Sequence, residues 1–431
     1  MNADQNKFKL ILTGVFIFFI LLGLVAFSTY KSPSNTSANI NITIWGTIDK
    51  NIFDSYINKY KQDKNLEFQL TYLYKSLNTI DNQLVEAIAT GKAPDAILIP
   101  QTLEKRYLDK VYLMTSIPTR DFLNTFVEEA ELYLRPTGIF ALPFFIDPLV
   151  MYWNRDIFSN AGIALPPTKW TEFPALSAKL SKSDNNANIT KSLTSLGEYR
   201  NVDNAKALLS TLIMQAGSPI ISEEGGIFRS KLTYQGPSDI LIPANSALQF
   251  FTDYSNPKKS VYSWNRSLPR SRQAFLSEDL AIYFGFASEF SDIKEKNPNL
   301  NFDVALMPQV LNANLKTTYG DIYGFSILKN TQNLVPTFNL ISLLTGADSV
   351  STLLQVADLA PARRDIISLG QKDPVKQVFS DSALISRSWV DPDMRRTDQI
   401  FQDMVENITT GRMDVNDSVS RANLELDGLL Q

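Results

Sequence analysis

Apolar residues after position 39 recur with two alternating spacings, and these spacings predict the local structure. The segments 40–45 and 66–74 carry apolar residues at strand spacing, and 96–99 is a short apolar run typical of a buried strand. Between them, apolar residues recur every three or four positions in 48–60 and 77–88, as in helices with one buried face. The order strand, helix, strand, helix, strand predicts parallel strands with helical crossovers, so this part of the chain is expected to be α/β.

Aromatic and charged residues lie at the ends of these predicted strands. In open parallel sheets, ligands bind beyond the carboxyl ends of the strands. Trp45, Tyr74 and Lys75 end two of the predicted strands, and Asp95 lies beside the third. We therefore expect these four residues at the rim of a ligand cleft. The alternative for each of them is a packing or capping role.

The pattern changes after residue 138. Residues 139–145 and 149–154 are extended apolar stretches separated by a short break that contains Asp147 and Pro148. This arrangement is typical of a strand pair that leaves one lobe for another. Crossings between lobes are expected where strand patterns give way to helix patterns, near 145–149, 270–276 and 328–335.

The amino-terminal segment predicts the location of the protein. Residues 10–28 contain no charge, and at about 1.5 Å per residue a helix of this length nearly spans a ~30 Å hydrocarbon core. Lys7 and Lys9 precede it, so the positive-inside rule predicts a cytoplasmic segment at 1–9, a transmembrane anchor at 10–28 and a flexible stalk at 29–39. The folded part would then lie outside the cytoplasm, on a single-pass cell-membrane protein. A signal peptide that is cleaved after the apolar run is the alternative.

Composition excludes several classes of function. The chain has no cysteine and no histidine, which removes disulfides, thiolate chemistry, Cys/His metal sites and histidine-based acid–base catalysis. The formal net charge is −4 and no long basic run is present, so nucleic acid is not expected as a partner. We expect no cofactor, no metal and no catalytic residue, although composition alone leaves carboxylate-based glycoside hydrolysis open.

Two neighbouring segments carry a family resemblance. Residues 141–163 (ALPFFIDPLVMYWNRDIFSNAGI) and 166–173 (PPTKWTEF) combine a proline, a short strand, a helix that ends in Ala-Gly, and a Pro-Pro pair before the next helix. They resemble the hallmark of extracellular solute-binding proteins of family 1, the maltodextrin-binding-protein group. Shorter pieces resemble the family in the same order, at 42–45, 89–95, 274–282, 302–308 and 321–328.

The resemblance implies a fold and a division of the chain. The family has the two-lobed periplasmic-binding-protein fold of type II, in which two α/β lobes are joined by a hinge and the ligand lies between them. By analogy, residues 40–146 plus 275–330 form the N-terminal lobe. Residues 147–274 plus 331–431 form the C-terminal lobe.

Candidate ligand-binding residues come from the strand ends and from this resemblance. Sugar sites combine flat aromatic faces with polar groups that bind hydroxyls. Asp147 lies where the chain changes lobe and can accept hydrogen bonds from a ligand, whereas an Asp-Pro turn is its alternative. Arg272 and Arg363 either face the cleft or form surface ion pairs. The full expected set is Trp45, Tyr74, Lys75, Asp95, Asp147, Trp264, Arg272, Phe286, Tyr323 and Arg363.

The function implied by the resemblance is that of the solute-binding subunit of an ABC importer. Such a protein would bind a small solute, a sugar or oligosaccharide, and deliver it as a monomer to membrane permease subunits. The GxxxxGK[ST] pattern of an ATPase is not present, so the ATPase would be a separate chain. A sensor or adhesion ectodomain with the same binding fold is an alternative, and a carboxylate-based hydrolase is another.

The uncharged run predicts a membrane-anchored protein. We expect the mature chain to retain residues 10–28 and to sediment with membranes after cell lysis, because a helix of this length is stable in a bilayer. Intact-mass measurement checks this. A mature amino terminus near Thr29 would show instead that the segment is cleaved.

Overall fold

The computed structural model describes residues 40–186, 188–235, 242–313 and 315–430. The segments expected at 1–9, 10–28 and 29–39 lie outside this part of the chain. Within the described residues, no helix combines the length and the apolar character needed to cross a bilayer.

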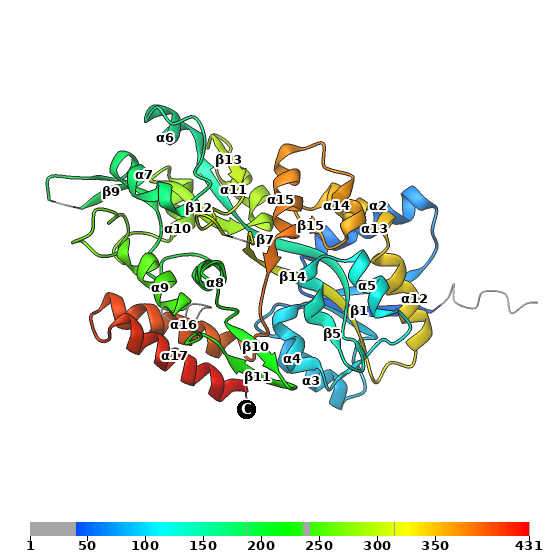
Figure 1. The fold of residues 1–431 in the computed structure, drawn as a ribbon. Coiled ribbons are helices and arrows are strands. Elements are labelled where there is room, and N and C mark those ends of the chain that lie inside the picture. Colours follow the sequence, from blue (N-terminus) through cyan, green and yellow to red (C-terminus); the bar gives the residue numbers. More distant parts are fainter. Residues whose placement is uncertain (1–39, 187, 236–241, 314, 431) are drawn as a thin grey trace, which may run out of the picture.

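The folded chain forms two lobes, each built around a sheet with helices beside it (Figure 1). In the N-terminal lobe, strand β1 (Asn41–Gly46) pairs in parallel with β2 (Gln69–Tyr74) and β3 (Ala96–Pro100). Helices α2 (Lys50–Lys64) and α3 (Ile80–Ala89) connect these strands, which confirms the expected strand and helix order.

The other elements of the N-terminal lobe come from two distant parts of the chain. Most follow β3 directly, and the last four come much later in the sequence. They are η2 (Gln101–Leu103), α4 (Glu104–Tyr107), β4 (Val111–Tyr112), α5 (Thr119–Thr125), η3 (Glu128–Tyr133), β5 (Leu134–Arg135), β6 (Gly138–Ile139), α12 (Leu334–Leu344), α13 (Ala347–Val356), β15 (Ala360–Pro361) and α14 (Arg364–Ser368).

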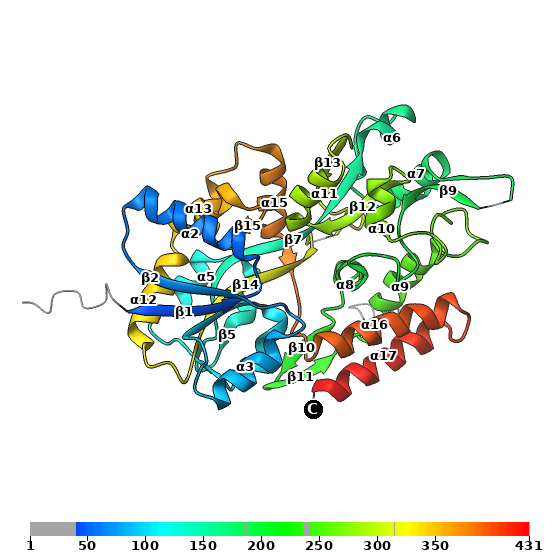
Figure 2. The ribbon, with the colours of Figure 1, turned by 180° about the vertical axis from the view of Figure 1, so that it is seen from behind.

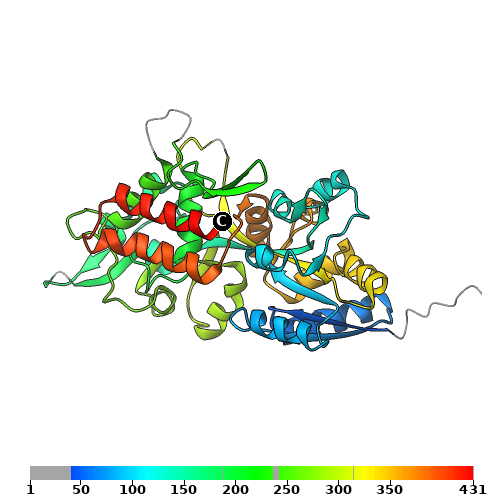
Figure 3. The ribbon, with the colours of Figure 1, turned by 90° about the horizontal axis from the view of Figure 1, so that it is seen from below.

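The C-terminal lobe surrounds a second group of strands (Figure 2). Its two long terminal helices pack against each other, as the view in Figure 3 shows. Its elements are α6 (Arg155–Asn160), η4 (Trp170–Glu172), α7 (Phe173–Leu180), β8 (Lys182–Ser183), β9 (Ile189–Thr194), α8 (Ala205–Gln215), β10 (Ile221–Glu224), β11 (Ile227–Ser230), α9 (Pro243–Asp253), α10 (Ser271–Leu276), β12 (Leu280–Phe286), η5 (Ala287–Glu289), α11 (Phe290–Lys296), β13 (Phe302–Ala305), α16 (Met394–Thr409) and α17 (Val415–Leu430).

Strand β7 (Leu142–Asn154) runs through both lobes, and all 13 of its residues are buried. Its first half pairs with β14 (Thr318–Leu328), up to the pair Pro148 and Gly320. From Leu149 onward it pairs with β12 instead. The change of partner at 148–149 is a crossing between lobes, as expected near 145–149. The other two crossings between the lobes lie at the amino end of β14 and in the segment from α15 (Pro374–Leu384) through β16 (Ser386–Arg387). The crossings expected at 270–276 and 328–335 were therefore wrong.

The expected lobe boundaries are corrected by the strand pairing. Residues 275–330 were expected in the N-terminal lobe, but β12 and β13 both pair with the second half of β7, and β12 also pairs with β9. Residues 331–431 were expected in the C-terminal lobe, but α13 packs against α2 and β15 pairs with the first half of β7. Sequence order cannot reveal these partners, because a chain with several crossings can return to either lobe.

Helix α2 begins at the carboxyl end of β1. The Asp49 side chain caps it by accepting a hydrogen bond from the backbone N–H of Asn51 at 2.8 Å. The helix ends at Asn65, which adopts the left-handed conformation. Asp49 therefore fixes where the helix starts after β1, and Asn65 fixes where it ends.

The lobes also touch away from the crossing strands. In one contact, the Lys105 ammonium of α4 donates to the backbone carbonyl of Leu429, at 3.2 Å, near the end of α17. In another, an Arg395 guanidinium nitrogen donates to the backbone carbonyl of Asn78 at 2.7 Å. The last turn of the chain therefore binds the opposite lobe.

The burial of Trp264 predicts a large effect on stability. Trp264 is 1% exposed, and its indole N–H donates to the Asn201 side chain at 3.2 Å. We expect Trp264→Ala to lower the free energy of unfolding by about 3–5 kcal/mol, because it leaves a cavity and a lost hydrogen bond. Tyr74→Ala, at a half-exposed position on the edge strand β2, should change it by less than about 1 kcal/mol. Urea unfolding of residues 32–431 measures both, and equal losses would contradict the burial argument.

Candidate functional site

A cavity of about 380 Å³ lies at the crossing between the lobes. We name it the Asp147 cavity. The N-terminal side is lined by the segment between β1 and α2, by residues of α2, β7 and β14, and by the end of α13 with the segment after it. Residues from η5 and α11 line it from the C-terminal side. The lining residues are Thr47, Ile48, Asp49, Ile52, Phe145, Asp147, Ser288, Ser291, Tyr323, Val356, Ala357, Asp358 and Leu359.

The two crossing strands position the floor of this cavity. Asp147 lies directly opposite Asp321, and Phe145 lies directly opposite Tyr323. Directly opposite residues of antiparallel strands share one face of the sheet, so all four side chains lie on the same face. The Phe145 and Tyr323 rings stack with centroids 4.6 Å apart and planes 14° apart. Phe145, Asp147 and Tyr323 line the cavity, so its floor combines aromatic surface with the Asp147 carboxyl.

Asp147 is a buried carboxyl that accepts a hydrogen bond from the Ser288 backbone N–H at 2.9 Å. Burial raises the pKa of Asp147 to about 7, and the charges of Asp321 and Glu289 act in the same direction. The Ser288 hydrogen bond acts against them. Because Ser288 belongs to the C-terminal lobe, this hydrogen bond joins the lobes at the cavity.

Asp321 is held by donors from both sides of the crossing. Its Oδ1 accepts from the Gln101 amide at 3.0 Å and from the Tyr319 hydroxyl at 2.9 Å. The same amide nitrogen of Gln101 donates to the Ser388 hydroxyl at 2.8 Å, so the third crossing segment joins this network. Burial raises the pKa of Asp321 as well. Asp147 and Asp321, which both have a raised pKa, thus lie side by side where the strands cross between the lobes.

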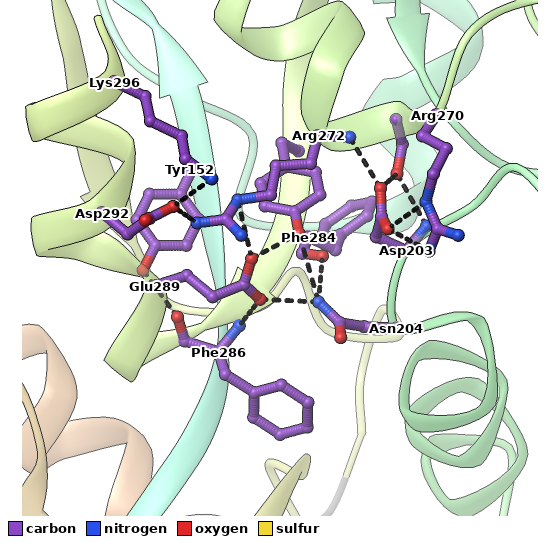
Figure 4. Close-up of polar contacts among 12 residues, drawn as sticks. Tyr152, Asp203, Asn204, Arg270, Arg272, Phe284, Phe286, Glu289, Asp292 and Lys296 are labelled. Carbon is purple, nitrogen blue, oxygen red and sulfur yellow. Dashed lines mark hydrogen bonds and ion pairs between the residues drawn. The ribbon is translucent and has the colours of Figure 1, made fainter. Parts of the chain in front are cut away.

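The C-terminal side of the cavity is fixed by Glu289 (Figure 4). Its carboxylate accepts from the Phe286 backbone N–H at 2.9 Å, from the Asn204 amide at 2.7 Å and from the Tyr283 hydroxyl at 2.7 Å. The Arg272 guanidinium lies 3.4 Å from Glu289 and also pairs with Asp292. Arg272 therefore supports the loop that carries Phe286 and Ser288. It does not line the cavity.

Three expected residues lie at the carboxyl ends of β1 and β2. The Lys75 ammonium lies 4.1 Å from the centroid of the Trp45 ring, so the structure brings these two residues together. Trp45 is 7% exposed and packs in the core, while Tyr74 is 50% exposed on the edge strand. Phe286 ends β12 and contacts Tyr319 edge to face at 6.2 Å. None of these residues lines the Asp147 cavity.

Two other expected residues have structural contacts away from the cavity. Asp95 lies at the amino end of β3, opposite to the ligand end, and accepts from the Thr43 backbone N–H at 2.9 Å and the Thr331 hydroxyl at 2.6 Å. The Arg363 guanidinium pairs with Asp365 at 2.7 Å. Both residues lie outside the Asp147 cavity, and each pairs with neighbouring groups in its own lobe.

Trp264 lies away from the Asp147 cavity too. It was expected in a loop at the cleft, but it is fully buried in the C-terminal lobe, where its indole N–H donates to Asn201. A tryptophan in a loop-like segment can close a cleft or fill a core, and the local sequence does not separate these roles.

The sequence reasoning missed Asp49, Ser288 and Asp358 as lining residues. Asp321 was overlooked too, although it lies in a segment that resembles the family. Pairing that segment in register with 141–154 would have placed Asp321 opposite Asp147.

Comparison with known proteins decides the family. The sequence profile of the bacterial extracellular solute-binding proteins matches residues 46–350. The chain belongs to this family. This solute-binding protein is accordingly a binding protein rather than an enzyme, and its family functions outside the cytoplasm.

Individual relatives of this solute-binding protein are distant. Binding proteins of Brucella abortus (strain 2308) and Brucella suis biovar 1 (strain 1330) are each 25% identical over 244 residues, which is 57% of this chain. The match spans 55% of the length of those relatives.

Solved structures share the fold across almost the whole chain. A cyclo/maltodextrin-binding protein in complex with maltotetraose has a TM-score of 0.72 at 14% identity, covering 93% of this chain and 99% of that protein. The GacH receptor of Streptomyces glaucescens GLA.O, solved unliganded and with acarbose, has a TM-score of 0.71 at 13% identity, covering 90% and 98%. The two-lobed α/β fold expected from the sequence is therefore confirmed.

The raised pKa of Asp147 predicts a pH-dependent contribution to stability. An unfolded aspartate titrates near pH ~4, whereas the folded carboxyl titrates at about 7, so the folded state binds the proton more tightly. The contribution of the Asp147 carboxyl to the free energy of unfolding is therefore largest below about pH 4. It decreases as pH rises and is lost above about pH 7. Relative to wild type, Asp147→Asn should therefore gain stability on the order of 4 kcal/mol between about pH 4 and pH 8. Urea unfolding at several pH values measures this difference, and a constant difference would contradict the burial of an ionisable carboxyl.

Proposed function

We propose that this protein is the extracytoplasmic solute-binding subunit of an ABC importer and that it binds a sugar or oligosaccharide between its lobes. Family membership supports the solute-binding role. The maltotetraose and acarbose bound by the structurally similar proteins support a saccharide as the ligand class.

One observation carries the proposal. The Asp147 cavity is lined by both lobes at the strand that crosses between them, with Asp147 on β7 and Ser288 on η5. A solute that fills it contacts both lobes only when they are close together, so it favours the closed form. A shift from mostly open to mostly closed requires about 10⁴-fold tighter binding to the closed form, or about 5.5 kcal/mol.

The chemistry of the cavity fits a polyhydroxylated solute. Asp49, Asp147 and Asp358 offer oxygens to ligand hydroxyls, and the stacked Phe145 and Tyr323 offer flat apolar surface to a sugar ring. We propose that Asp147 and Tyr323 contact the solute directly. Phe286, Arg272 and the Trp45–Lys75 pair act from outside this cavity.

We further propose that the protein acts as a monomer that hands its solute to membrane permease subunits. Residues 10–28 serve as the membrane anchor, which keeps the lobes near the permease. The open and closed forms differ in shape, and that difference tells the permease whether solute is bound.

Small-angle scattering and calorimetry of residues 32–431 test the mechanism. A panel of glucose, maltose, maltotriose, maltotetraose and acarbose is titrated first. We expect at least one to bind and to lower the radius of gyration, because closure brings the lobes together. Tight binding with an unchanged scattering curve would show that hinge closure is wrong for this protein.

A substitution tests the position of the site. Asp147→Asn should weaken binding of the solute found in the panel by about 1–3 kcal/mol, because it removes a carboxylate acceptor at the cavity floor. Asp365→Asn is the matched control, since Asp365 is exposed and pairs with Arg363 outside the cavity. Equal affinities for Asp147→Asn and the control would place the solute elsewhere.

A further inference from the structure

A second and larger cavity also lies between the lobes. Its volume is about 590 Å³, within the range of small-molecule sites. Residues of η3 and β5 line it from the N-terminal lobe, residues of α8, β10 and β11 line it from the C-terminal lobe, and 387–390 of the third crossing segment complete it. It shares no lining residue with the Asp147 cavity. We name it the Glu129 cavity.

Glu129 is the distinctive group in its wall. The residue is only 2% exposed, and its Oε1 has no hydrogen-bond partner within the described part of the chain. Burial and the charge of Asp321 raise the pKa of Glu129, and a hydrogen bond from the Ser388 backbone acts against them. Buried polar groups are nearly always paired, so an unpaired carboxyl oxygen in the wall of a large cavity indicates a missing hydrogen-bond partner.

The charges around the cavity indicate what kind of donor fits. Both lining arginines already have carboxylate partners, because Arg387 pairs with Glu128 and Arg135 pairs with Glu104 outside the lining. Three lining carboxyls, those of Glu129, Glu131 and Glu223, have no ion-pair partner among the described residues. Glu131 and Glu223 therefore place negative charge at the edge of the cavity, and a cation that enters it favours the ionised form of the buried Glu129.

We propose that the Glu129 cavity is a second ligand site, which binds a protonated amine with the Glu129 carboxylate as its buried acceptor. A charge-assisted hydrogen bond from an ammonium group satisfies Oε1, and Glu131 and Glu223 at the exposed edge add to the attraction. Glu129 and Glu223 belong to different lobes, so the amine draws the lobes together. The inference does not depend on which solute fills the Asp147 cavity.

Calorimetry of the full-length chain in uncharged detergent tests the site. The probes are putrescine and glucosamine, with their neutral counterparts 1,4-butanediol and glucose. We expect saturable binding of at least one amine, and at least about tenfold weaker binding of its neutral counterpart, because only the amine offers a charged donor. Binding of putrescine alone assigns a linear amine, and binding of glucosamine alone assigns an amino sugar.

Glu129→Gln removes the charge and keeps the shape of the side chain. It should weaken binding of the amine about tenfold or more. Glu67→Gln is the matched control, because it removes one carboxylate at an exposed position outside the cavity and should leave the affinity unchanged. Thermal unfolding of both variants checks folding.

The proposal is overturned if neither amine binds, if the neutral counterparts bind equally well, or if a folded Glu129→Gln binds the amine as tightly as wild type. If Glu129→Gln does not fold, the comparison of amine with neutral probe on the wild-type chain decides.

Discussion

The architecture depends on the continuity of β7. One buried strand serves two sheets, and its backbone changes hydrogen-bond partner between Pro148 and Leu149. Proline has no N–H to donate and is rare in central strands. Its place at this change of partner leaves the strand without a ladder donor where the two sheets separate. The hydrogen-bond ladder of β7 is therefore already interrupted at the position where the two sheets separate.

The same crossing gathers buried carboxyls. Asp147 and Asp321 face each other across β7 and β14, and Glu129 lies close enough to Asp321 for their charges to interact. Each of the two aspartates is held by donors, namely the Ser288 backbone, the Gln101 amide and the Tyr319 hydroxyl. Burial of several acidic groups costs folding free energy unless each is paired or neutral. These donors offset part of that cost at the crossing between the lobes.

The strand and helix order could be predicted from the sequence, because apolar spacing reports which face of an element is buried. The crossing at 145–149 could also be predicted, since the break at Asp147 interrupts two apolar stretches. Lobe membership of β12, β13 and α13 could not, because it depends on pairing between segments far apart in sequence.

The candidate site was predicted only in part. Asp147 and Tyr323, which lie on hallmark strands, line the Asp147 cavity. Trp264 lies in the core instead, which the sequence could not predict because an aromatic side chain suits a core and a cleft equally well. Asp95 was misplaced because it precedes its strand. Only the direction of β3 shows that this end lies opposite the carboxyl ends of the parallel strands.

The contact between Lys105 and the Leu429 carbonyl has a practical consequence for engineering. The final turn of α17 belongs to the C-terminal lobe, yet its backbone is tied to α4 of the N-terminal lobe. A purification tag, a fluorescent fusion or a truncation at this end would perturb this contact between the lobes. An amino-terminal fusion is remote from this contact in sequence, and it leaves the carboxyl-terminal turn in its natural form.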